Sequence, residues 1–188
     1  MNKETENVLS EFEQVTTIYG SFKQRTFASL IDGLILLPLV AVDWFNKSGW
    51  KSQLLLIATF LIALLYKIFF EYKYGATIGK KAMQLIVVNK DLLGVNLKEV
   101  LVRNVFDITW KTIFFVIDII TYRSTGFINV TSNEQFVAFQ KNLINVNPYL
   151  LVYFLVIIIE VVFILTDKKR RALHDRMGDT FVIKAKFR

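Results

Sequence analysis

The sequence predicts an all-α membrane protein with four transmembrane helices and a short, two-stranded β-element on the cytoplasmic side. Of its 188 residues, 54% are hydrophobic, and the mean hydropathy is +0.43, which is too apolar for an ordinary soluble domain. Four apolar stretches approach the ~20 residues that cross about 30 Å of hydrocarbon. Lysine and arginine are concentrated in only some of the segments outside these stretches, as in multi-pass membrane proteins.

The four apolar stretches differ in how clearly they predict a membrane span. The second has no charged residue between Leu54 and Tyr66, whereas the third is interrupted by Asp107, Lys111 and Asp118. The predicted spans lie near residues 25–44, 53–70, 105–122 and 149–166. We therefore expect a polar leader over residues 1–20 and a transmembrane domain over residues 21–188.

The distribution of lysine and arginine predicts the orientation in the bilayer. The segment up to Arg25, the 67–103 segment and the tail from residue 167 hold three, seven and eight of these residues, while the other two connections hold two each. The protein is expected in the cell inner (plasma) membrane. Because cytoplasmic segments carry the excess of positive charge, both termini are expected on the cytoplasmic side. The 123–148 connection, rich in Asn, Thr and Ser, is then an outward-facing loop.

The leader and the cytoplasmic connection carry further local signals. The leader lacks the apolar core of a signal peptide and is either a short amphipathic surface helix or a loose tail. Residues 85–89 and 180–184 are predicted strands that pair, because neither would be stable alone. Asn96 and Glu99 form a capping-box pattern that predicts a helix start.

Two features argue against nucleotide or nucleic-acid binding. Gly75 and Gly79 precede Lys80, but a P-loop needs four residues between its glycines and a Ser or Thr after the lysine, where this chain has Lys81. The net charge of +7 is explained by the orientation of a membrane protein.

No catalytic chemistry is indicated by the sequence. The chain has no cysteine, no Gly-x-Ser-x-Gly motif and a single histidine, His174. A lone histidine rarely forms a metal site, so we expect no enzyme activity, no cofactor and no metal.

Ionisable residues inside the predicted spans are the candidate functional residues. Asp32 lies within the first span, where an aspartate costs about 2.5–3.5 kcal/mol on insertion scales. Arg25 lies seven residues earlier, on the same helical face. Glu160 lies in the fourth span with no cation within one turn, so it needs a partner from another helix or a proton. Asp175 and Asp179 follow the last span, and Asp175 is a plausible partner for Arg25.

Taken in order, these motifs resemble the RDD family of small bacterial membrane proteins, named for one arginine and two aspartates. The family's arginine matches Arg25, and its first aspartate matches Asp32. Its second aspartate matches Asp175, with Asp179 as the alternative. The resemblance covers roughly residues 20–185. The other matching motifs are Thr77-Ile78-Gly79-Lys80, Ile86-Val87-Val88, Arg103-Asn104 and His174-Asp175 through Thr180 and Val182.

The resemblance implies a small transporter that exchanges monovalent cations for protons, since cation/proton antiport is associated with some members. In that interpretation Asp32 binds the ion, Arg25 tunes its pKa and Asp175 gates the cytoplasmic mouth, within a homo-oligomer in the lipid bilayer. The alternative is a non-transporting scaffold or accessory protein. In both interpretations Arg25, Asp32 and Asp175 are expected to form a polar lock between the first span and the C-terminal segment.

Overall fold

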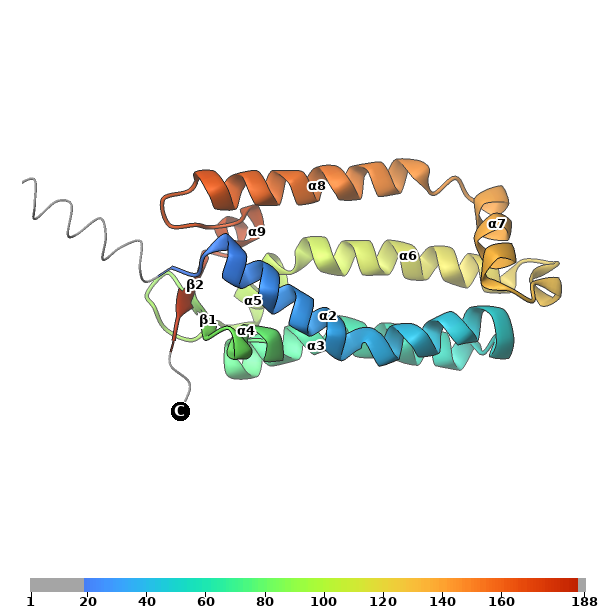
Figure 1. The fold of residues 1–188 in the computed structure, drawn as a ribbon, viewed down its shortest axis with the longest axis horizontal. Helices are drawn as coiled ribbons and strands as arrows, with labels where there is room; N and C mark the ends of the chain where they lie inside the picture. The colour runs from blue at the N-terminus through green and yellow to red at the C-terminus, as the bar shows by residue number, and fades with distance from the viewer. Residues whose placement is uncertain (1–18, 186–188) are drawn as a thin grey trace, which may run out of the picture.

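A computed structural model describes residues 19–185 of the chain. The leader predicted over residues 1–20 therefore lies outside the described residues, except for its last two positions. Four long helices lie side by side along the long axis, and the shorter elements gather at the two ends (Figure 1). In chain order the elements are α2 (Phe22–Phe45), η1 (Asn46–Trp50), α3 (Gln53–Tyr74), α4 (Ile78–Ala82), β1 (Leu85–Asn89), α5 (Leu97–Arg103), α6 (Val105–Arg123), η2 (Phe127–Asn129), α7 (Asn133–Leu143), α8 (Asn147–Thr166), α9 (Leu173–Met177) and β2 (Thr180–Lys184).

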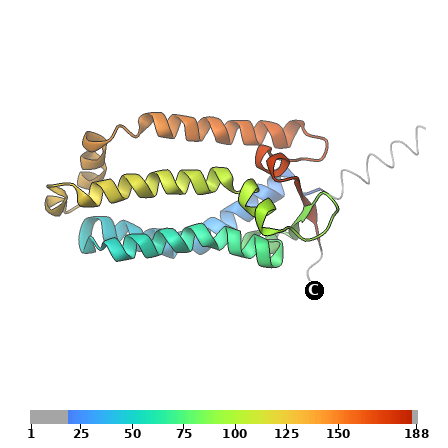
Figure 2. The same ribbon diagram turned by 180° about the vertical axis from the view of Figure 1, so that it is seen from behind.

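Three of the long helices are long and apolar enough to cross a membrane: α2 continued by η1, then α3 and α8. The fourth, α6, ends one residue beyond the predicted span of 105–122 and lies between α8 and α3 when the molecule is seen from behind (Figure 2). Its composition does not meet the same criterion, because Asp107, Lys111 and Asp118 lie within it. Three of the four predicted stretches are therefore confirmed as helices that are long and apolar enough to cross a membrane.

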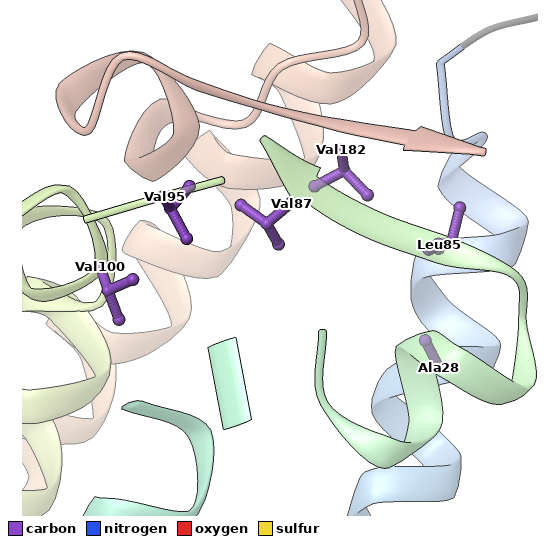
Figure 3. Packing of buried hydrophobic residues seen from close by; sticks show 6 residues of the cluster. All are labelled: Ala28, Leu85, Val87, Val95, Val100 and Val182. Atoms are coloured by element: carbon purple, nitrogen blue, oxygen red, sulfur yellow. The ribbon is translucent and has the colours of Figure 1, made fainter. Parts of the chain in front are cut away.

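The predicted β-element is confirmed in place and register. β1 and β2 pair antiparallel, with Val87 opposite Val182. Gly20 donates its backbone N–H to the carbonyl of Val182 at 2.9 Å, and Tyr19 forms a β-bridge with Ile183, so these two residues lie along the other edge of β2. The apolar side chains of β1 and β2 pack with those of α2 and α5 (Figure 3). This core consists of Ala28, Leu85, Val87, Val95, Val100 and Val182.

The start of α5 follows the predicted capping box. The Asn96 side chain accepts the backbone N–H of Glu99 at 2.9 Å, and the Glu99 carboxylate accepts that of Asn96 at 2.8 Å. These two bonds satisfy backbone donors that a helix start otherwise leaves unpaired. The sequence signal therefore sets the boundary between the sheet and the helix that leads into α6.

The connection over residues 123–148, predicted as a loop, is partly helical. This segment contains η2 and α7, and α7 crosses the end of the bundle (Figure 1). Ser132 caps α7, and Phe136 enters a second core with Leu56, Tyr122 and Phe127. The sequence did not predict α7, because the segment is rich in Asn, Thr and Ser and the apolar face of the helix consists of only a few residues.

Candidate functional site

Asp175 lies at the centre of a buried ionic network. Its side chain has no exposed surface. Arg25 Nη1 lies 2.5 Å from Asp175 Oδ2, and Arg103 Nη1 lies 3.0 Å from Asp175 Oδ1. The Arg25 guanidinium also donates to the carbonyl of Arg170 at 2.8 Å. The predicted contact between Arg25 and Asp175, 150 residues apart in sequence, is confirmed.

The charge state of Asp175 follows from this geometry. Burial alone would raise its pKa, but the guanidinium groups of Arg25 and Arg103 outweigh burial and hold the pKa well below its usual range. Asp175 is therefore an ionised carboxylate between two cations at neutral pH. Such an arrangement tolerates burial because each charge has a partner.

Glu71, near the end of α3, is a second fully buried carboxylate, which we did not select from the sequence. It pairs with Lys80 and with Arg103, whose Nε lies 3.2 Å from Oε2, and it accepts a hydrogen bond from Asn104 Nδ2 at 2.8 Å. Burial, aided by Arg103, lowers the pKa of Lys80 to about 8, although Glu71 opposes the shift. Arg103 thus joins Glu71 to Asp175.

Asp32 lies outside this network, which corrects the predicted three-residue lock. Its carboxylate accepts hydrogen bonds from Tyr66 Oη at 2.7 Å, Thr77 Oγ1 at 2.7 Å and the Gly79 backbone N–H at 2.8 Å. These donors come from α3 and from the start of α4. Asp32 of α2 therefore holds both elements against α2 through hydrogen bonds. Gly79 is required there, since a Cβ would lie 2.1 Å from the Ala28 carbonyl oxygen.

Glu160 obtains its partner from another helix, as predicted. Its carboxylate lies 2.8 Å from His174 Nδ1 and accepts the His174 backbone N–H at 3.2 Å. His174 Nε2 lies 3.3 Å from Asp175 Oδ1, so Glu160 joins the network through His174. Asp179 is exposed and makes no side-chain contact with these groups, which favours Asp175 as the second aspartate of the motif.

These residues form the Asp175 network, which ties α2, α3, α4, α5, α8 and α9 together at the end that carries the sheet. Its members are Arg25, Glu71, Lys80, Arg103, Asn104, Glu160, His174 and Asp175. Removing one partner from a buried ion pair typically costs about 3–5 kcal/mol, because it leaves the other charge buried and unpaired.

A separate charged group, the Lys47 cluster, lies toward the end that carries α7. It consists of Asp43, Lys47 and Asp118, with Lys47 Nζ 3.0 Å from each carboxylate. Gln140 of α7 donates to Asp118 Oδ1 at 2.9 Å. Asp43 Oδ1 is buried and accepts no hydrogen bond from any described residue. The cluster carries a formal net charge of −1.

The Lys47 cluster lines a cavity of about 430 Å³ between α2, α3, α6 and α8. Most of the other lining side chains are aliphatic or aromatic, among them Leu56, Phe60, Trp110, Phe115 and Tyr153. Within residues 19–185, no group of three carboxylate or histidine side chains could hold a metal ion. The cavity is instead an apolar space with a charged wall.

A family model described as the RDD family matches residues 19–179, the part of the chain that holds Arg25, Asp32, Thr77–Lys80, Arg103-Asn104 and His174-Asp175. The chain belongs to the RDD family. No curated protein and no solved structure matches it. Membership of the RDD family and the apolar helices fit an integral membrane protein.

The RDD motifs now have structural explanations. Arg25 and Asp175 form the central ion pair, whereas Asp32 receives the Thr-Ile-Gly-Lys segment. Arg103-Asn104 supplies two of the three side chains that bind Glu71, and Lys80 is the third. The sequence did not indicate a role for Glu71, because it follows an apolar stretch and is flanked by lysines. That pattern is typical of the end of any membrane-spanning helix. The Arg103-Asn104 motif was the available signal, since a buried arginine needs a carboxylate partner.

Proposed function

We propose that this RDD protein is a small transporter that exchanges monovalent cations for protons. The observation that carries the proposal is the cavity between the four long helices, with Asp43, Lys47 and Asp118 in its wall. Ionisable groups inside a helix bundle are expensive to keep and typically mark ion or proton pathways. The proposed activity is transport without chemical conversion.

The residues proposed to exchange ions are Asp43 and Asp118 rather than Asp32. Asp32 already accepts three hydrogen bonds from the protein, so binding an ion there would require breaking them. Asp43 and Asp118 share one lysine, and Asp43 has an oxygen without a donor. Protonation or cation binding at this pair would neutralise its excess negative charge.

The proposed topology has four crossings, with α6 as the third and both termini in the cytoplasm of the plasma membrane. α6 packs on α3, and its Trp110 contacts Tyr153 of α8 with ring centroids 5.4 Å apart. Lys111 is neutralised by Asp107 at 2.8 Å and donates to the Ala63 carbonyl. α8 buries none of its residues within the described chain, which leaves its surface for lipid and for a second copy in the proposed homo-oligomer.

Reconstituted proteoliposomes with a trapped pH-sensitive dye test the transport function. Adding Na⁺ or K⁺ outside is expected to drive proton movement that depends on the protein. Asp43→Asn and Asp118→Asn should each lower the rate at least about tenfold, because each removes an exchangeable charge. Asp179→Asn, which removes an exposed carboxylate that does not line the cavity, is the matched control. Wild-type vesicles that show no cation-dependent proton movement would contradict the proposal.

A scaffold or accessory role is the second candidate, favoured by a specific observation. Arg25, Asp32 and Asp175 all bind other groups of the same chain, and none of the three lines the cavity. Residues used only to hold helices together would look the same. If Asp43→Asn and Asp118→Asn leave a wild-type proton flux intact, the pathway lies elsewhere; if the wild type has no flux, the scaffold role remains.

A further inference from the structure

The shape and lining of the cavity restrict what it can hold. Its volume of about 430 Å³ falls within the ~300–1,000 Å³ range of small-molecule sites and far exceeds the ~30 Å³ share of one water molecule. Phe60 and Phe115 stack in its wall with ring centroids 4.0 Å apart, and Trp110 and Tyr153 add two more aromatic faces. An apolar space of this size has room for an organic molecule beside the carboxylates, and an organic monocation is itself a monovalent cation of the class proposed for transport.

The charge of the cavity wall restricts the ligand further. Lys47 neutralises only one of the two carboxylates it contacts, and the other charged group of the wall, Lys111, is paired with Asp107. Counted together with Asp107, the charged groups at the cavity therefore sum to −1, and they lie beside aromatic rings. Both features attract a cation, since aromatic faces stabilise cations within about 6 Å. A phosphate-bearing lipid headgroup would be repelled by the two carboxylates.

We propose that this cavity binds an amphipathic organic monocation, with its charged group beside Asp43 and Asp118 and its apolar body among Phe60, Trp110, Phe115 and Tyr153. The inference rests on the proposed transport function in that it names the substrate class of the same site. The site is nevertheless defined by binding at equilibrium, which is measured separately from flux.

Equilibrium binding of radiolabelled tetraphenylphosphonium tests the inference. The full-length protein is placed in phosphatidylcholine nanodiscs, and uptake by empty nanodiscs is subtracted. We expect saturable binding of about one cation per chain. If lipid acyl chains fill the cavity instead, discs with and without protein take up equal amounts, and the proposal is wrong.

Two charge variants are expected to change the affinity for tetraphenylphosphonium in opposite directions. A merely structural role of these residues would not produce opposite changes. Asp43→Asn should weaken binding about tenfold, and Lys47→Met should strengthen it about tenfold, because the wall becomes neutral in the first and doubly negative in the second. Asp179→Asn should leave affinity unchanged. Equal affinity in Asp43→Asn and wild type, or weaker binding in Lys47→Met, would overturn the proposal. Asp118→Asn repeats the first test if either variant fails to elute as a folded protein.

A steric variant locates the bound cation. Ala63 lines the cavity, so Ala63→Phe should abolish binding without changing any charge, whereas Leu65→Phe on the exposed face of the same helix should not. Binding retained in Ala63→Phe places the cation elsewhere and overturns the proposal. Sodium-driven proton flux without tetraphenylphosphonium binding would reject this site but keep the transport function. Binding without any flux would do the reverse.

Discussion

Single side chains set the ionic structure at the end of the molecule that carries the sheet. Asp175 has no exposed surface, yet it faces Arg25 and Arg103 and is also 3.3 Å from His174 Nε2. Replacing it would leave two guanidinium groups without their shared anion. A cost of about 3–5 kcal/mol is expected for such a loss.

The depressed pKa of Asp175 predicts an acid-sensitive contribution to stability. A carboxylate whose folded-state pKa lies below its unfolded value of about 3.9 stabilises the fold above that pH. This contribution decreases as the pH falls below about 4 and is lost as the pH passes through the folded-state pKa. We therefore expect the difference in Tm between wild type and Asp175→Asn, measured in detergent, to shrink as the pH is lowered from 7 toward 2.

Two comparisons make this prediction specific to Asp175. Asp179→Asn, at an exposed position, should follow the wild-type profile. Arg25→Lys keeps a cation but loses the guanidinium fork, so its Tm at pH 7 should fall between those of wild type and Asp175→Asn. A constant Tm difference for Asp175→Asn from pH 7 to pH 2 would contradict the assigned ion pairing.

At the scale of elements, the packing of α4 on α2 depends on two residues at one contact. Asp32 of α2 accepts the Gly79 N–H at 2.8 Å, and the Gly79 Cα lies against the backbone of Ala28. Backbone atoms cannot yield as a flexible side chain would. The Thr-Ile-Gly-Lys motif is therefore a helix-packing element whose glycine allows close approach.

Gly79→Ala should destabilise the protein, since the added Cβ would lie 2.1 Å from the Ala28 carbonyl oxygen and α4 would have to move. Overpacking of this kind typically costs about 1–3 kcal/mol, which a thermal melt in detergent measures as a lower Tm. Gly33→Ala is the matched control, because nothing lies within 4 Å of its Cβ position. It should leave Tm unchanged or raise it, since alanine favours a helix over glycine. Equal effects of the two changes would refute this account of α4 packing.

At the scale of the whole molecule, charge is concentrated at two levels of the bundle. The Asp175 network joins six helices at the end that carries the sheet, and the Lys47 cluster lies toward the end that carries α7. The sheet and α7 lie at opposite ends of the bundle (Figure 1). The network has its charges paired within the protein, whereas the cluster keeps an excess negative charge at a cavity. We infer that the first end is built for rigidity and the second for binding.

The proposed orientation predicts which ends of the bundle are accessible from each side. The chain has no cysteine, so single replacements report accessibility without background. Lys141→Cys, exposed in α7, should react with an impermeant maleimide in intact cells. Lys98→Cys, exposed in α5, should react only after permeabilisation. Labelling of both positions from the same side would reject the four-crossing topology.

Much of the fold was determined by the sequence itself. Apolar stretches set the long helices, the Asn96–Glu99 capping box set the start of α5, and two short apolar runs set strands that pair as predicted. These signals act within a few residues or along one helix, so they predict structure even when the packing of the helices is unknown. The predicted orientation puts Arg25 and Asp175 at the same end of the molecule, which led to the prediction that they pair, and the structure shows this contact.

Which charges meet depends on the three-dimensional packing of the helices. Arg103 joins Glu71 to Asp175, Asp32 turns to Tyr66 and α4, and Lys47 bridges α2 and α6. These contacts link residues far apart in the chain, and the partner of a buried charge depends on helix rotation and on the backbone approach at Gly79. The cavity has the same origin, because it is space left between four helices and no local pattern encodes it.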